Sequence, residues 1–139
     1  QLYVTQSLAQ SMVELSSNKW VVFILINIFL LIAGFFLPPV AVIVMTSAIL
    51  LPVITTLGFD PYWFAIVFTI NMEIGLITPP VGLNLYIIKG ITPDVSLSEI
   101  LKGSIPFMII MALAIVILCI FPEIVTWLPD KIMGKDLGF

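Results

Sequence analysis

The chain contains no histidine and no arginine, only one cysteine, and charged residues fill just 9% of its 139 positions. The absence of histidine excludes imidazole-based catalytic triads, proton relays through imidazole and most zinc sites. The single thiol, Cys119, cannot form an intrachain disulfide, and we expect it to be a small residue facing lipid or the protein core. Five lysines and a net charge of −3 provide no basic surface, so nucleic-acid binding is excluded.

What the chain has in abundance is apolar residues, which make up 61% of it. A soluble domain carries about 25% charged residues, so this composition does not provide a water-facing surface, and it is too apolar for a disordered chain. We therefore predict an all-α integral membrane protein, embedded in a lipid bilayer. The sequence begins at Gln1 without an initiator methionine. We expect the C-terminal part of a longer chain, with a complete small membrane protein after processing as the alternative.

Charged residues separate three long apolar stretches, which cover residues 20–59, 61–88 and 103–122. A membrane-spanning helix needs about 20 apolar residues, so the third stretch predicts one ordinary span. The first stretch has twice that length. The second stretch has a charged residue at each end, which predicts a single crossing of the membrane. It also contains one internal charge, Glu73.

Two interruptions divide the first and second stretches, and both read Gly-x-x-x-Pro-Pro-Val, at residues 34–40 and 75–81. Adjacent prolines cannot continue a helix, and the residue before a proline is displaced from helical geometry. The first interruption is wholly apolar, whereas a turn in water normally carries polar residues. We therefore predict a re-entrant hairpin over 19–58, with two plain spans joined by a tight turn as the alternative. The second interruption predicts a discontinuous transmembrane helix over 59–91.

The prolines have a chemical consequence, because each leaves the carbonyl four residues earlier without its helical donor. The carbonyls concerned belong to Gly34, Phe35, Gly75 and Leu76. Unpaired backbone at membrane depth is tolerated only where protein or a water-lined cavity surrounds it. Carbonyls at the ends of half-helices suit cations the size of Na⁺ or H₃O⁺, and half-helix N-termini suit anions. The alternative is a pair of purely structural kinks.

Two polar side chains near the second interruption are candidate functional groups. A charge at mid-membrane costs about 2.5–3.5 kcal/mol on insertion scales. Glu73 is therefore a candidate ligand of a coupling ion, proton acceptor or structural acceptor for neighbouring hydroxyls. Asn84 follows Pro80 by about one helical turn, and its side chain is suited to donate to a substrate carboxylate or to offer its oxygen to a cation. The alternative is a structural hydrogen bond between transmembrane helices. No pattern of catalytic residues accompanies them, so we expect no enzyme.

The remaining segments are assigned from their charges and helix signals. Residues 92–103 are predicted as an interfacial loop and short helix, in which Ser96 and Glu99 form a capping box. The other predicted segments are an amphipathic connecting helix over 1–18, a C-terminal transmembrane helix over 104–128 and a polar tail over 129–139.

Four stretches carry a family resemblance. They are Gly-Phe-Phe-Leu-Pro-Pro-Val-Ala at 34–41, Ile-Leu-Leu-Pro at 49–52, Gly-Phe-Asp-Pro-Tyr-Trp-Phe at 58–64 and, most specifically, Asn-Met-Glu-Ile-Gly-Leu-Ile-Thr-Pro-Pro-Val-Gly-Leu-Asn-Leu at 71–85. They resemble the second half of the large membrane subunit of tripartite ATP-independent periplasmic (TRAP) transporters. The resemblance implies half of an inverted-repeat, elevator-type, multi-pass transporter in the bacterial inner membrane. It also implies a small TRAP membrane subunit and a periplasmic substrate-binding protein as partners, and import of an organic acid such as a dicarboxylate or sialic acid.

The resemblance further implies Na⁺ as the coupling ion and no other cofactor. The hairpin and the broken helix then border the ion and substrate sites. The expected Na⁺-binding residues are Gly34, Phe35, Gly75, Thr78 and Gly82, and the expected substrate-binding residues are Val40 and Asn84. Many family members have Asp-Pro-Thr where this chain has Pro38-Pro39-Val40, so any Na⁺ here must depend on backbone carbonyls at the tip. The alternatives are a proton-coupled broken-helix transporter that uses Glu73 and a membrane scaffold subunit without transport activity.

Overall fold

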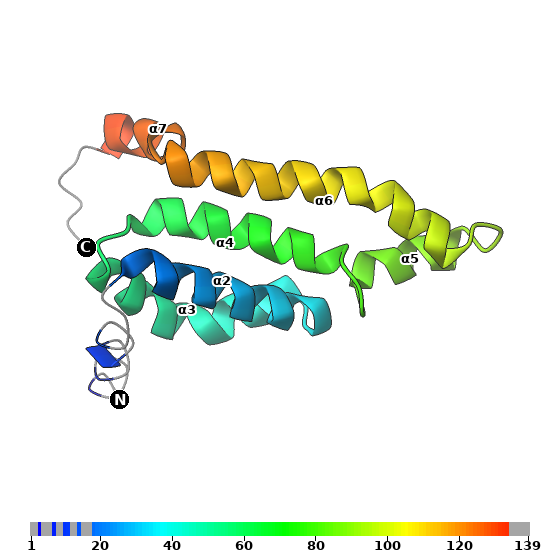
Figure 1. Cartoon of the computed structure of the whole chain (residues 1–139), viewed down its shortest axis with the longest axis horizontal. Coiled ribbons are helices and arrows are strands. Elements are labelled where there is room, and N and C mark those ends of the chain that lie inside the picture. The colour runs from blue at the N-terminus through cyan, green and yellow to red at the C-terminus, as the bar shows by residue number, and fades with distance from the viewer. Residues whose placement is uncertain (1–2, 4–6, 8–9, 12–13, 15–17, 134–139) are drawn as a thin grey trace.

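A computed structural model describes residues 18–133 continuously, together with the single residues 3, 7, 10, 11 and 14 (Figure 1). This described part is helical and contains no strand. Its helices are α2 (Lys19–Phe36), α3 (Pro39–Thr56), α4 (Pro61–Leu76), α5 (Leu83–Ile91), α6 (Leu97–Ile120) and α7 (Glu123–Met133). Most of the predicted connecting helix at 1–18 and the tail beyond 133 lie outside the described residues.

Helices α2 and α3 form an antiparallel hairpin with a two-residue connection at Leu37 and Pro38 (Figure 1). Both connecting residues have extended backbone, because neither Pro38 nor Pro39 offers an amide hydrogen to continue α2. Pro39 then opens α3 at the first helical position, where a missing amide hydrogen costs nothing. Each arm has 18 residues, or about 27 Å at 1.5 Å per residue.

The helix predicted over 59–91 is divided, as expected, into α4 and α5 by residues 77–82. Asp60 begins α4, since its carboxylate accepts hydrogen bonds from the amides of Tyr62 (2.8 Å) and Trp63 (3.1 Å). The Pro79–Pro80 peptide bond is cis. Gly82, with φ +53°, precedes the first residue of α5.

The hairpin is shorter than the bundle that it packs against. Figure 1 shows that its tip ends beside the interruption between α4 and α5. Helix α5 and the first turns of α6 extend beyond that level, and α6 then returns along α5 and α4 (Figure 1). The two proline interruptions, about 40 residues apart in the sequence, are therefore at the same height in the bundle.

The C-terminal elements differ from the expected boundaries. The short helix expected within 92–103 and the span expected over 104–128 are one continuous helix, α6, of 24 residues. Ser96 and Glu99 form the predicted capping box at its start. It ends at Phe121 because Pro122 disfavours helical geometry in the residue before it, and α7 follows as a separate helix.

Within the described part of the chain, three helices are long and apolar enough to cross a membrane by length and composition: α2, α3 and α6. Both hairpin arms meet this criterion, so length alone does not distinguish a re-entrant hairpin from two spans. Large apolar side chains are exposed on all three helices, including Phe29, Met45 and Ile110. Exposed apolar surface of this extent is the expected outer face of a protein surrounded by lipid or further helices.

An aromatic cluster joins α2, α4 and the loop before α4. Trp63 is buried and its ring lies 5.1 Å from that of Phe23 and 5.3 Å from that of Phe59, centroid to centroid. Its indole N–H donates a 2.7 Å hydrogen bond to the carbonyl of Leu118 in α6. That carbonyl has no helical donor because the residue four positions later is Pro122. Trp63 therefore ties α6 to α4.

Candidate functional site

The two Gly-x-x-x-Pro-Pro motifs touch through their glycines. A Cβ placed on Gly75 would lie 2.8 Å from the carbonyl carbon of Gly34 and 3.0 Å from its Cα and its oxygen. A Cβ on Gly34 would instead meet Met72, whose Cε is 3.4 Å away, and the Cα of Gly75 at 3.6 Å. The backbones of α2 and α4 are therefore in direct contact, which only a residue without a side chain permits at position 75.

At the hairpin tip, two carbonyls lack helical partners. The last regular bond of α2 runs from the amide of Leu37 to the carbonyl of Ala33, at 3.0 Å. The next two carbonyls, of Gly34 and Phe35, face prolines where their donors would be, and no other backbone donor among the described residues replaces them. The oxygen of Gly34 lies against Gly75.

At the second interruption, one expected free carbonyl is paired. The carbonyl of Gly75 accepts a bond from the amide of Thr78 (3.3 Å), because the chain tightens into a three-residue turn before the prolines. The expectation that Pro79 leaves this oxygen free is therefore wrong, while Pro80 offers no donor to Leu76. The hydroxyl of Thr78 donates to the carbonyl of Ile74, so its oxygen lone pairs remain available to a cation.

The start of α5 depends on a glycine. Gly82 has left-handed backbone, and a Cβ there would lie 3.0 Å from the carbonyl oxygen of Thr78. No side chain caps this helix, so its first amides point toward the interruption without a side-chain acceptor. Asn84 is the second residue of α5 and is half-buried. Val40 has the equivalent place in α3 and is 73% exposed.

Glu73 lies apart from the glycine contact. It is exposed on α4, on the same face as Thr69, whose hydroxyl donates to the carbonyl of Ala65 (2.8 Å). Gly75 and Met72 face α2 instead. The structure therefore brings Gly34 and Gly75 together but does not place Glu73 at their contact.

A buried polar link accompanies the glycine contact, and it was not predicted as a pair from the sequence. Asn71 is 4% exposed, and its amide nitrogen donates to the backbone oxygen of Asn27 (2.9 Å) and to its side-chain oxygen (3.2 Å). Asn27 in turn donates to the carbonyl of Phe23 at 2.9 Å. Two asparagines in otherwise apolar stretches were the available signal, since polar side chains in membrane helices commonly bond across an interface.

This link predicts a measurable coupling. In a double-mutant cycle, Asn27→Ala and Asn71→Ala should show an interaction energy of about 0.6–1.7 kcal/mol in the free energy of unfolding, the range for hydrogen bonds between membrane helices. The measurement is unfolding of the detergent-solubilised protein by increasing denaturant. Thr69→Val is the matched control, because its hydroxyl bonds within its own helix. The coupling reports on the 3.2 Å bond between the two side chains, because Asn27→Ala keeps the backbone oxygen that accepts the 2.9 Å bond. Strictly additive effects would contradict the side-chain bond, and a harmless Asn71→Ala would contradict the link as a whole.

Among the described residues, no group of three or more histidine, cysteine, aspartate or glutamate side chains is placed to hold a metal ion. The oxygens gathered at the interruptions belong to the backbone and to Thr78. Two proline interruptions that meet within a bundle of apolar helices are a feature shared with helical membrane transporters.

The comparison with known proteins identifies the family. Residues 2–124 match the family model described as the tripartite ATP-independent periplasmic transporter, DctM component. The chain belongs to this family of large TRAP permease subunits. The predicted resemblance is thereby confirmed.

Individual relatives cover nearly all of this chain. A C4-dicarboxylate TRAP transporter large permease protein of Vibrio cholerae is 34% identical over 96% of it, and one of Pseudomonas aeruginosa is 37% identical over 91%. A sialic acid TRAP transporter large permease protein of Vibrio cholerae is 30% identical over 93%. The chain spans 29%, 30% and 30% of the lengths of these three relatives, so it corresponds to less than a third of each.

Proposed function

We propose that this chain forms part of the ion and substrate pathway of a sodium-coupled importer of organic acids. The observation that carries the proposal is the meeting of the two interruptions, with Gly34 against Gly75. This contact brings the unpaired carbonyls at the end of α2 close to the tightened end of α4. Carbonyl oxygens at half-helix C-termini are suited to Na⁺.

The anionic substrate would be held by hydrogen-bond donors, which lie at the same two interruptions as the carbonyl oxygens proposed for Na⁺. The N-termini of α3 and α5 both begin at the interruptions, and neither has a side-chain cap. Amides at helix N-termini attract carboxylates, which is valuable in a chain without arginine. Asn84 would add a side-chain hydrogen bond. The named substrates of the relatives, C4-dicarboxylates and sialic acid, are carboxylates, which supports this class of substrate.

The hairpin is proposed to be re-entrant. Its tip stops beside the α4–α5 interruption, while α5 and α6 extend further (Figure 1). A helix of about 27 Å that ended at mid-bundle would place its apolar, proline-rich turn inside the protein instead of in water. In the assembled transporter, the hairpin and the broken helix would move together as part of an elevator-type transport domain in the inner membrane.

The assembled transporter would also contain a small membrane subunit and receive its substrate from a periplasmic binding protein. Membership of the TRAP family supports the proposal of these partners. The share of selectivity that resides in the binding protein would then explain why related permeases serve chemically different acids.

The coupling ion is tested with Thr78. In proteoliposomes that contain the assembled transporter, uptake should follow an imposed Na⁺ gradient and not a pH gradient. Thr78→Val removes one oxygen ligand and should raise the Na⁺ concentration for half-maximal uptake at least about tenfold, equivalent to about 1.4 kcal/mol. Thr78→Ser keeps the oxygen and should retain the affinity. Uptake driven by pH and lost in Glu73→Gln would instead establish proton coupling, and an unchanged Na⁺ dependence in Thr78→Val would remove Thr78 from the site.

A further inference from the structure

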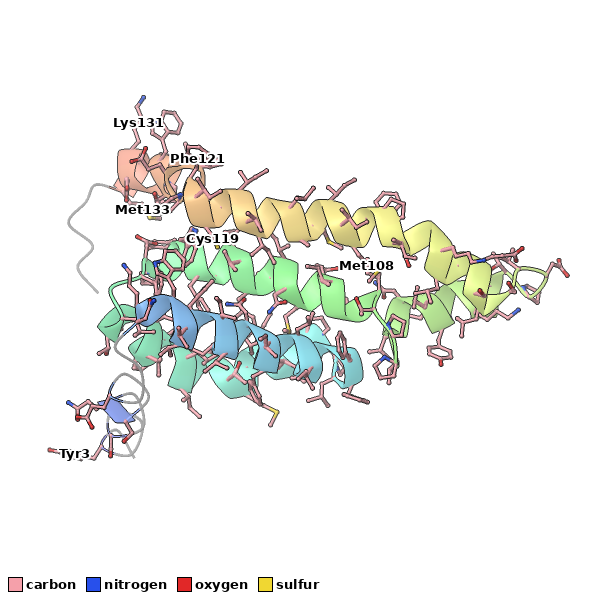
Figure 2. The ribbon with its side chains drawn as sticks, viewed as in Figure 1. Tyr3, Met108, Cys119, Phe121, Lys131 and Met133 are labelled. Atoms are coloured by element: carbon pink, nitrogen blue, oxygen red, sulfur yellow. The ribbon has the colours of Figure 1, made fainter. Side chains whose placement is uncertain are left out.

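A cavity of about 320 Å³ lies at the end of the bundle opposite the hairpin tip. It is half open to the surface and is lined by the start of α2, the start of α4, the end of α6 and α7. Its lining combines two aromatic rings, charges of both signs and a hydroxyl: Trp20, Phe59, Lys19, Asp60, Asp130 and Thr126. Cys119 also lines it, and Figure 2 shows this side chain pointing from α6 toward α4.

The cavity lies level with the ends of the membrane-length helices. All three helices of membrane-spanning length have one end here, since α2 begins at Lys19, α3 ends at Thr56 and α6 ends at Ile120. Charged residues and tryptophans gather at this end, as they do where helices leave the hydrocarbon core. The flanking helices expose apolar side chains, among them Ile24 and Ile120. A ligand in the cavity therefore has charged side chains on one side and the exposed apolar side chains of α2 and α6 on the other.

The charges that line the cavity are separated. The ammonium of Lys19 lies 5.1 Å from the ring centroid of Phe59 and 5.9 Å from that of Trp20, so the two rings hold it in place. Among the described residues, no carboxylate oxygen lies within 4.0 Å of it, although Asp60 and Asp130 line the same cavity. One oxygen of Asp60 is already used to cap α4, so Asp130 is the carboxylate that remains free of backbone bonds.

We propose that this cavity binds the headgroup of a zwitterionic phospholipid that carries a primary ammonium, as phosphatidylethanolamine does. The lipid phosphate would accept hydrogen bonds from Lys19. Its ammonium would donate to Asp130, and its glycerol and acyl chains would lie along α2 and α6. A ligand with both charges satisfies both ends of the cavity, whereas an anionic lipid leaves Asp130 facing a negative headgroup. Phosphatidylcholine has no N–H to donate, so it fits less well.

The experiment measures which lipid remains with the protein. The assembled transporter is extracted in mild detergent from membranes that contain phosphatidylethanolamine, phosphatidylglycerol and phosphatidylcholine, and the retained lipids are quantified by mass spectrometry. The wild type should retain phosphatidylethanolamine above its share in the membrane. Lys19→Gln and Asp130→Asn should each lower this enrichment at least about fivefold, while Lys19→Arg should preserve it.

Lys131→Gln is the matched control. Lys131 also lies over a tryptophan ring, 4.9 Å from the centroid of Trp127, but it is outside the cavity and points away from the other helices (Figure 2). Its replacement should leave the enrichment unchanged. Equal retention in Lys19→Gln and the wild type would overturn the proposal, and so would equal enrichment of phosphatidylcholine or preferential retention of phosphatidylglycerol. Displacement of the lipid by free phosphoethanolamine at equal concentration would also overturn it, because it would show a site for a small solute.

Discussion

Replacing Gly75 by alanine should separate α2 from α4 and abolish most of the transport activity. The added Cβ would lie 2.8–3.0 Å from three backbone atoms of Gly34, and backbone atoms cannot move aside by changing a rotamer. Overpacking of this kind costs about 1–3 kcal/mol, and here the displacement also moves the carbonyls proposed to bind the coupling ion. Thermal unfolding and Na⁺-driven uptake of the same preparation measure both effects.

The other glycine of the contact provides the control. An alanine at Gly34 would meet the flexible end of Met72 at 3.4 Å and the backbone of Gly75 only at 3.6 Å, which is ordinary van der Waals contact. Gly34→Ala should therefore be much milder, with a change in unfolding free energy below about 1 kcal/mol. A harmless Gly75→Ala would show that the contact is less close than described. A Gly34→Ala as damaging as Gly75→Ala would show that Gly34 has less room than described.

The second large effect is expected at Trp63. Trp63→Ala should destabilise the protein by about 3–5 kcal/mol, because it leaves a cavity among the packed aromatic rings and removes the indole donor. Trp63→Phe keeps a ring but leaves the carbonyl of Leu118 unpaired, at a cost of about 1–3 kcal/mol. Both values are differences in the free energy of unfolding, measured in detergent.

A tryptophan outside the cluster serves as the reference for these variants. Trp127 on α7 is 60% exposed, so Trp127→Phe should change the unfolding free energy by no more than about 0.5 kcal/mol. If Trp63→Phe matched the wild type, the bond to Leu118 would contribute no net stability, and the attachment of α6 would rest on apolar packing alone.

The contacts between α2 and α4 change how the glycine motif is understood. From the sequence, Gly34 and Gly75 were expected to matter for the carbonyls that the prolines release. In the structure both glycines also serve a packing role, since they bring the two interrupted elements together. Asn27 and Asn71 add a hydrogen bond across the same interface, about two turns before Gly34 in α2 and about one turn before Gly75 in α4. The first hairpin arm and α4 are thus joined by backbone contact and by a polar link.

Short-range sequence signals were sufficient to predict the membrane class and several element boundaries of this protein. The scarcity of charge established the membrane class, the paired prolines located both interruptions, and Ser96 with Glu99 marked the start of a helix. Each of these depends on the residue itself or on neighbours within four positions, so the sequence shows them directly. The motif over 71–85 was likewise enough to indicate the family.

Long-range partnerships were decided only by the tertiary structure. Whether Gly34 meets Gly75, Asn71 meets Asn27, and Trp63 reaches the carbonyl of Leu118 depends on which helix faces turn toward each other. In a chain that is apolar on almost every side, hydrophobic periodicity does not reveal those faces. The continuity of α6 through Pro106 is a similar case, because a proline is tolerated in a membrane helix when its surroundings accommodate the lost hydrogen bond.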